Sequence, residues 1–304
     1  MMFGIGAGEA YVSGSDEVLD ISGWTTPDTL EYLTGIKVYN LGVSGETSNE
    51  IALRQGGIKM YVDNTFEVGY DDSVEVSIVD EYGNPVYMAD FSAYGYVEPH
   101  EPDVVYINDD MFKITGTEET GLYICRYSED NVDYDAFTTV YEGTEVITKA
   151  SYERKGDILI LEIGSNGGWD NYRQLISQYD AMIQNAGCDY YIIVGDTDDP
   201  GTSIADTSQG FCNEDGTYIG VGDTAWEATL SEVYGEHFIN MRTYLIENGL
   251  KDAGLRTTSA DYRGFRRGRI SKQLRSDWTH FNSYGYYAKG LAIYEKGVEL
   301  GYWK

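Results

Sequence analysis

Two continuous apolar runs, "DILILEIG" at residues 157–164 and "DYYIIVGD" at 189–196, constrain the fold of this chain most. A strand that is buried on both faces has this pattern, because neither face needs a polar residue at every second position. Between the runs, apolar residues recur at helical spacing from Tyr172 to Ile183, which predicts an amphipathic helix. Strands that alternate with helices form βαβ units, so the pattern predicts an α/β fold with a mostly parallel sheet.

The same alternation continues on both sides of these runs. Towards the C-terminus we expect a helix near 226–234, a strand at 237–242, a short helix at 243–250 and a last helix at 282–300. Towards the N-terminus we expect a helix at 27–34 and a strand at 36–43 ("IKVYNLGV"). A further helix should begin at a cap on Thr47 or Ser48 and end at the Gly56–Gly57 pair.

Residues 58–152 have a different pattern. Polar residues alternate with Val74, Val76 and Ile78, and short β-rich segments are joined by turns rich in Gly, Asn and Asp. This segment predicts an antiparallel β domain, inserted between the second and third strands of the α/β domain. The predicted domains are therefore a discontinuous α/β domain of 1–57 and 153–304, and an inserted β-rich domain of 58–152.

The composition limits the partners. The formal net charge is -30, from 51 acidic and 21 basic residues, so the surface repels nucleic acid and anionic membranes. A small-molecule or glycan substrate fits this surface, whereas nucleic acid and membrane do not, and the oligomeric state stays open. Three histidines and three widely spaced cysteines make neither a His-rich metal site nor a disulfide framework. We therefore expect no metal site built on histidines or cysteines and no cofactor, whereas a calcium site built on carboxylates stays open.

The beginning of the chain is abrupt. "MMFGIGAGEA" has no charged and then apolar region of the kind found in signal peptides, and no stretch of the chain is long and apolar enough to span a membrane. Only Met1–Phe3 precede the first Gly-rich turn, whereas a first strand has roughly five residues. We expect that the N-terminus is truncated and that an upstream secretion signal has been lost with the missing residues.

Candidate functional residues follow the predicted strands. Ligands of open α/β sheets bind beyond the carboxyl ends of the strands. There the sequence places "LGVSGETS" with Gly45, "IGSNGGW" with Asn166, and, near the C-terminus, "RSDWTHFNSYGY" with Asp277 and His280. A turn glycine N–H and an asparagine amide can hold an oxyanion, and an Asp three residues before a His can orient its imidazole. Each residue taken singly also fits a plain turn or cap.

Three of these segments resemble the SGNH (GDSL-type) hydrolases. "KVYNLGVSGETSNEIALRQGG", "EIGSNGGW" and "RSDWTHFNSYGY" are similar to that family's blocks II, III and V, in that order. The resemblance implies a flavodoxin-like three-layer α/β sandwich and a serine esterase without cofactor. It also implies roles: Gly45 and Asn166 as oxyanion hole, Asp277 as orienting acid and His280 as general base. Some bacterial members carry a similar inserted β module.

The family's nucleophile is missing from this chain. Block I of the family reads Gly-Asp-Ser-Leu, but here "MMFGIGAG" either places Gly4 at the nucleophile position or lacks the Asp-Ser pair between Gly4 and Ile5. Substitutes in the sequence are Ser13, Ser15, Ser44 and Thr197. Without a nucleophile, His280 activates water at best, and rates fall by orders of magnitude.

Two functions are therefore predicted from the sequence. The first is an esterase that removes acyl groups from a carbohydrate or a small ester, with activity weak or lost. The second is an inactive pseudoenzyme that binds a carbohydrate or another ligand.

Three further segments are open to two interpretations. The basic run Arg263, Arg266, Arg267, Arg269 and Arg275 would face a carboxylate-bearing substrate or pair with acids of the chain. Asp196, Asp198 and Asp199 would bind calcium or form a solvated turn. Trp169 would stack on a sugar ring or pack at the edge of the core.

Overall fold

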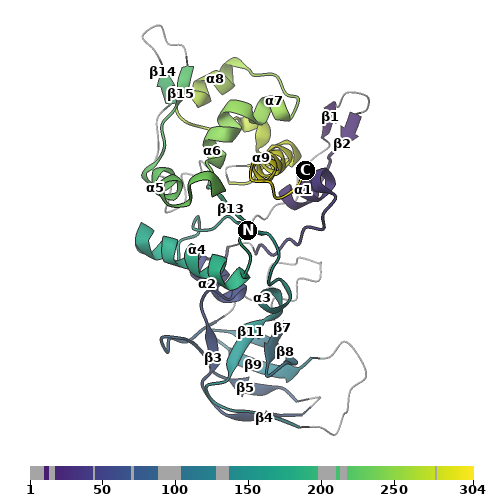
Figure 1. The fold of residues 1–304 in the computed structure, drawn as a ribbon, viewed down its shortest axis with the longest axis vertical. Coiled ribbons are helices and arrows are strands. Elements are labelled where there is room, and N and C mark those ends of the chain that lie inside the picture. The colour runs from purple at the N-terminus through teal and green to yellow at the C-terminus, as the bar shows by residue number, and fades with distance from the viewer. Residues whose placement is uncertain are drawn as a thin grey trace. The chain divides into compact units, whose positions relative to one another are not determined.

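The computed structural model of the chain describes residues 10–13, 18–43, 45–69, 72–87, 104–127, 137–197, 210–212, 218–277 and 279–304. It divides into two compact units, drawn in Figure 1. Unit 1 comprises 1–43, 160–167 and 190–304, and unit 2 comprises 44–159 and 168–189. The predicted domain bounds, with 58–152 as an insert, stay a prediction.

Unit 1 holds a small parallel sheet and most of the helices. The sheet has the strand order β12 (Leu159–Leu161), β13 (Tyr191–Val194) and β16 (Phe238–Ile239). Two short antiparallel hairpins accompany it, β1 (Tyr11–Ser13) with β2 (Val18–Asp20), and β14 (Gly210–Cys212) with β15 (Tyr218–Val221). The helices are α1 (Thr26–Thr34), α5 (Ala225–Tyr234), α6 (Met241–Tyr244), α7 (Leu250–Asp252), α8 (Ser259–Phe265) and α9 (Ser283–Glu299), with short helical turns η2 (Gly235–His237), η3 (Leu245–Gly249) and η4 (Lys272–Leu274).

The core of unit 1 is aliphatic and aromatic. Helix α9 packs against α1, as Figure 1 shows, and Gly290 lies where any side chain would overlap Thr29 of α1. Ile192 and Val194 of β13 are fully buried, with Ile293 of α9 in the same cluster. Each such side chain stabilises the fold by about 1.5–3 kcal/mol relative to an exposed position, so this packing holds α9 in place.

Unit 2 holds a seven-stranded antiparallel sheet. Its strand order is β5 (Val74–Val76), β9 (Gly121–Arg126), β8 (Asp110–Thr117), β7 (Val104–Ile107), β11 (Glu145–Thr148), β3 (Met60–Val62) and β6 (Ile78–Asp80). The first and last strands, β5 and β6, are separated only by Ser77, so one extended segment forms both edges. The sheet is therefore nearly closed, like a barrel.

The other described residues of unit 2 form one strand pair and three helices. Strand β4 (Phe66–Val68) pairs with β10 (Thr138–Val140), and the helices are α2 (Ser48–Gln55), α3 (Lys149–Glu153) and α4 (Tyr172–Ala186). Helix α2 packs on α4. Thr47 caps α2 through a reciprocal pair of hydrogen bonds with Glu50, and Gly56 ends the helix in the left-handed conformation, as the sequence predicts.

The predicted fold class is wrong. Among the described residues the only parallel sheet has three strands, and the largest sheet is antiparallel, so the protein is not a mostly parallel α/β sandwich. The two apolar runs do form neighbouring strands of this parallel sheet, β12 and β13, and β13 pairs with β16 through Ile193 with Phe238 and Val194 with Ile239. The sheet is smaller than expected because the segment 36–43, which the sequence predicts as a strand, does not join it.

The segment 36–43 is the clearest case. It was expected as a strand, but it forms no β pairing, and Ile36 and Tyr39 are about half exposed. Its amides bind side chains instead: Val38 donates to Glu31 of α1 at 2.9 Å, and Gly42 donates to Asn40 Oδ1 at 3.2 Å. These contacts occupy donors that a strand would use in a ladder. The other strand expected in this region begins at Met1, outside the described residues.

Candidate functional site

The loop that carries Asp277 and His280 is a tight hairpin between η4 and α9. Arg275 and Phe281 form an antiparallel bridge, and Ser276 donates its N–H to the His280 carbonyl at 3.0 Å. Asn282 then caps α9 by accepting the Gly285 N–H at 3.2 Å, while its amide donates to the Gln273 carbonyl at 2.9 Å. The hairpin therefore begins and ends on hydrogen bonds that fix its direction before the helix.

The side chains of Asp277 and His280 meet within this hairpin. Asp277 Oδ2 lies 2.9 Å from His280 Nδ1, and Oδ1 accepts the backbone N–H groups of His280 at 2.7 Å and of Thr279 at 2.8 Å. These hydrogen bonds lower the pKa of Asp277 to about 2. The bond from the His280 backbone N–H has the largest effect, and the bond from the His280 ring has the next largest. Asp277 is therefore a carboxylate at neutral pH.

An ionised Asp277 decides the tautomer of the neutral imidazole. A carboxylate only accepts hydrogen bonds, so Nδ1 of His280 carries the proton and Nε2 keeps its lone pair. The two side chains are 56% and 53% exposed, which leaves His280 accessible to a solute. The arrangement can accept a proton at Nε2, which is what a general base does.

Asn166 lies in the turn that follows β12, also in unit 1. Gly164 has φ of 108°, and Gly167 donates its N–H to the Gly164 carbonyl at 3.1 Å, so residues 164–167 form a closed turn. Asn166 is exposed at this turn. Its position beyond the carboxyl end of a parallel strand is the one that the sequence predicts for a ligand-binding residue.

Gly45 lies in unit 2, directly before the helix α2. It is exposed and has φ of 81°, a conformation that favours glycine. The next residue, Glu46, is buried and forms a two-pronged ion pair with Arg54 of α2, at 2.8 Å and 2.6 Å. Gly45 is thus anchored to α2. The joint action of Gly45 and Asn166 as an oxyanion hole stays a prediction, because each unit holds one of them.

The nucleophile position cannot be placed on this structure. Gly4, Ser15 and Ser44 lie outside the described residues, as do Asp198 and Asp199, and of Ser13 only the backbone in β1 is described. Thr197 follows β13 in unit 1. Within the described ranges, no three His, Cys, Asp or Glu side chains gather in a way that could hold a metal ion.

The other predicted residues lie as follows. Arg263, Arg266, Arg267 and Arg269 are exposed at the end of α8 and beyond it, and none forms an ion pair with a described residue. Arg275 is partly buried, and burial lowers its pKa. Trp169 stacks on Tyr172 at 5.5 Å between ring centroids, both in unit 2.

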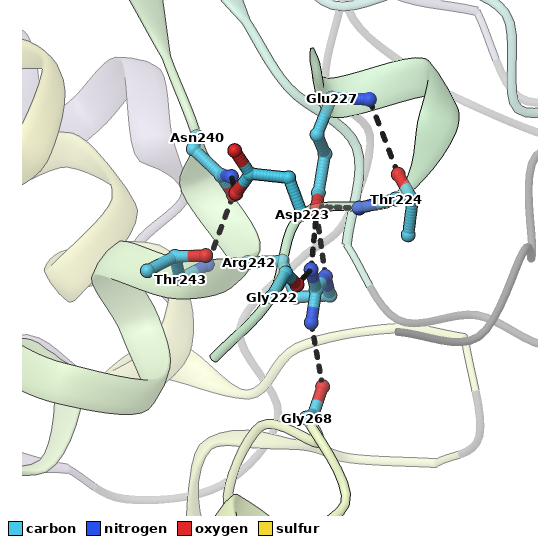
Figure 2. A network of polar contacts seen from close by, with 8 residues as sticks. All are labelled: Gly222, Asp223, Thr224, Glu227, Asn240, Arg242, Thr243 and Gly268. Carbon is cyan, nitrogen blue, oxygen red and sulfur yellow. Dashed lines mark hydrogen bonds and ion pairs between the residues drawn. The ribbon is translucent and has the colours of Figure 1, made fainter. Parts of the chain in front are cut away.

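Two buried ion pairs of unit 1 were missed by sequence reasoning. Lys289 of α9 pairs with Glu162 just after β12, and Arg242 pairs with Glu227 of α5. Figure 2 shows the Arg242 guanidinium between the Glu227 carboxylate and the carbonyls of Gly222 and Gly268. The available signal was a single charge inside an apolar run, "ILILEIG" for Glu162 and "YYAKGLAIY" for Lys289.

Comparisons with family models, curated proteins and solved structures give no match to this chain. In the part of the chain that the structure describes, no helix has the length and apolarity needed to cross a membrane.

Proposed function

We propose that this protein hydrolyses acyl esters, as the SGNH hydrolases do, at a low rate. The observation that carries the proposal is the contact of 2.9 Å between Asp277 and Nδ1 of His280, in an exposed hairpin before the last helix. The resemblance of three sequence blocks to that family supports it. The substrate class is an acylated carbohydrate or another small ester, because the acidic surface suits a neutral solute.

The proposed reaction uses water in place of the absent serine. Nε2 of His280 removes a proton from a water molecule, and the resulting hydroxide adds to the acyl carbonyl carbon. The amide of Asn166, in the same unit as His280, donates to the tetrahedral oxyanion. The intermediate then collapses, the bond to the alkoxide breaks, and the alkoxide takes the proton from the His280 imidazolium. The products are a carboxylic acid and an alcohol.

Hydrolysis of p-nitrophenyl acetate tests this proposal. The expected result is slow turnover that His280→Ala reduces to the level of buffer. His237→Gln is the matched control, because His237 is also in unit 1 but its Nδ1 contacts the Tyr191 carbonyl and the Tyr302 hydroxyl. A rate that His280→Ala leaves unchanged would show that surface groups, and not this dyad, cleave the ester.

A second function rests on the sequence at the N-terminus. The chain either has Gly4 where the family has its serine or lacks the Asp-Ser pair between Gly4 and Ile5, and both alternatives favour a binding protein without catalytic activity. In that case the purified protein shows no His280-dependent turnover, but it binds some of the oligosaccharides on an array that carries acetylated and unmodified forms. Asn166→Ala should then weaken retention, and an array without any bound member contradicts this function.

A further inference from the structure

The ion pair of Glu162 and Lys289 lies in the interior of unit 1. Lys289 Nζ is 2.8 Å from Glu162 Oε1 and 3.1 Å from Oε2. The side chains are 4% and 12% exposed for Lys289 and Glu162, respectively. Two charges lose their hydration at such a site, so they persist there only when they pair closely with each other.

Each partner is adjacent to, or in contact with, one of the two segments of unit 1 that carry candidate site residues, the Asn166 turn and the His280 hairpin. Glu162 directly follows β12 and lies four residues before Asn166. Lys289 lies in the second turn of α9, and its Nζ is also 5.1 Å from the centre of the Phe281 ring. Phe281 directly follows His280 and is buried. The ammonium group therefore contacts the strand end before Asn166 and the residue next to His280.

We infer that Glu162 and Lys289 are a positioning pair that fixes the Asn166 turn relative to the His280 hairpin. The physical reason is that the Lys289 ammonium cannot leave Glu162 without losing its only strong electrostatic partner among the described contacts. The attraction between the Lys289 ammonium and the Phe281 ring links the His280 hairpin to the same ammonium group. The functional meaning of the pair rests on the function proposed above, whereas its effect on the two segments does not.

The Arg242–Glu227 pair provides a matched control. It is also buried, with side chains 4% and 3% exposed, and lies in the same unit. Its carbonyl partners belong to Gly222 and Gly268, in neither the Asn166 turn nor the His280 hairpin (Figure 2). A general loss of stability should follow from the removal of either pair. A local effect on the Asn166 turn and the His280 hairpin should follow only from removal of the Glu162–Lys289 pair.

Amide hydrogen exchange of the full-length protein tests the inference without any assumption about activity. In Glu162→Gln/Lys289→Met, we expect exchange in both 163–167 and 276–281 to rise by about tenfold or more. In Glu227→Gln/Arg242→Met, exchange in these two segments should stay near the wild-type rate. If the double variant does not fold, Glu162→Gln alone keeps a hydrogen-bond acceptor for Lys289 and should show a smaller rise in the same two segments.

The outcomes separate this inference from the proposed function. Unchanged exchange in either segment, or an equal rise in the control variant, overturns the positioning pair whether or not the protein is an esterase. If exchange rises as expected but the wild type hydrolyses no ester, the pair stands and the proposed function fails. If both hold, kcat of Glu162→Gln/Lys289→Met should fall by about tenfold with KM within about twofold, because alignment of the reacting groups is lost rather than binding.

Discussion

Asp277 binds both the backbone and the ring of His280: Oδ1 accepts the His280 N–H at 2.7 Å, and Oδ2 lies 2.9 Å from Nδ1. Replacement by Asn keeps the shape but not the charge. An amide donates to Nδ1, which moves the ring proton to Nε2 and removes the base. We therefore expect Asp277→Asn to lower kcat for p-nitrophenyl acetate by about 100-fold or more.

The control for this change is Glu236→Gln, which removes an exposed acid elsewhere in unit 1 and should leave kcat unchanged. The pKa of Asp277, at about 2, also predicts that Asp277 contributes no step to the pH dependence of kcat above about pH 4. Equal values of kcat for wild type and Asp277→Asn would show that the carboxylate does not orient His280.

A second prediction concerns pH and stability. The Tyr244 hydroxyl lies 2.9 Å from Asp252 Oδ2 and 3.0 Å from Glu295 Oε2, but it has one proton to donate. Burial, opposed by the Tyr244 hydrogen bond and reinforced by the Glu295 charge, raises the pKa of Asp252 above 3.8. A raised pKa means that the folded state favours the protonated acid. This contribution to stability is complete below pH 3.8 and is lost as the pH rises through the folded-state pKa.

Asp252→Asn should imitate the protonated acid. Since the site is about half-buried, we expect Asp252→Asn to be more stable than the wild type at pH 7, with a free energy of unfolding that is higher by up to about 1 kcal/mol. The charges that face the site are Glu295 of α9 and Lys251 of α7. At pH 3, below both pKa values, the two proteins should differ little. Urea unfolding at both pH values measures this, and a variant that is less stable at pH 7 contradicts the assignment.

Local rules predict the helices better than the sheets. The cap at Thr47 and the stop at Gly56 depend on residues next to each other in the chain, and α2 forms where they place it. Segment 36–43 has the composition of a strand, but its conformation depends on Glu31, whose side chain accepts a hydrogen bond from the Val38 N–H. A pattern of apolar residues carries no information about such a competing acceptor.

Long-range pairing limits the prediction of the site in the same way. Asp277 and His280 are three residues apart, so their contact follows from spacing within one hairpin. Glu162 and Lys289 are 127 residues apart, and only the fold brings them together. The near closure of the large sheet is similar, because it depends on the change of partner at Ser77 between β5 and β6.

A third prediction concerns the close approach of Gly168 to the start of α2 in unit 2. A Cβ on Gly168 would lie 2.8 Å from Thr47 Cβ and 2.9 Å from the backbone nitrogens of Ser48 and Asn49. Its φ of 85° adds backbone strain for any other residue. We expect Gly168→Ala to lower the free energy of unfolding by about 2–4 kcal/mol, the sum of overpacking and strain.

Gly167→Ala separates the two causes. Gly167 has φ of 80° but no atom within 4 Å of the added Cβ, so only the strain of about 1–2 kcal/mol should appear. Both variants are compared with wild type by urea unfolding. If the two substitutions lower the free energy of unfolding equally, the start of α2 moves to make room for the added methyl group without cost. The close contact between residue 168 and the start of α2 then does not require glycine.

A fourth prediction concerns the buried partner of Glu46. Arg54 donates two hydrogen bonds to the Glu46 carboxylate, and the two side chains are 5% and 2% exposed. The Arg54 carbonyl accepts the Thr148 hydroxyl. Arg54→Met leaves the Glu46 charge buried without its cation. We expect a loss of about 3–5 kcal/mol in the free energy of unfolding, because an uncompensated buried charge costs more than the pair contributes.

The pair Lys296–Glu299 of α9, in which the Lys296 side chain is 18% exposed, serves as the control. Glu299 is 62% exposed, so Lys296→Met should change the free energy of unfolding by less than about 1 kcal/mol. Glu46→Gln/Arg54→Met removes both charges and should recover part of the loss, since no buried charge then remains. If Arg54→Met costs no more than Lys296→Met, Glu46 reaches water in solution and the Arg54 pair does not anchor the segment that carries Gly45.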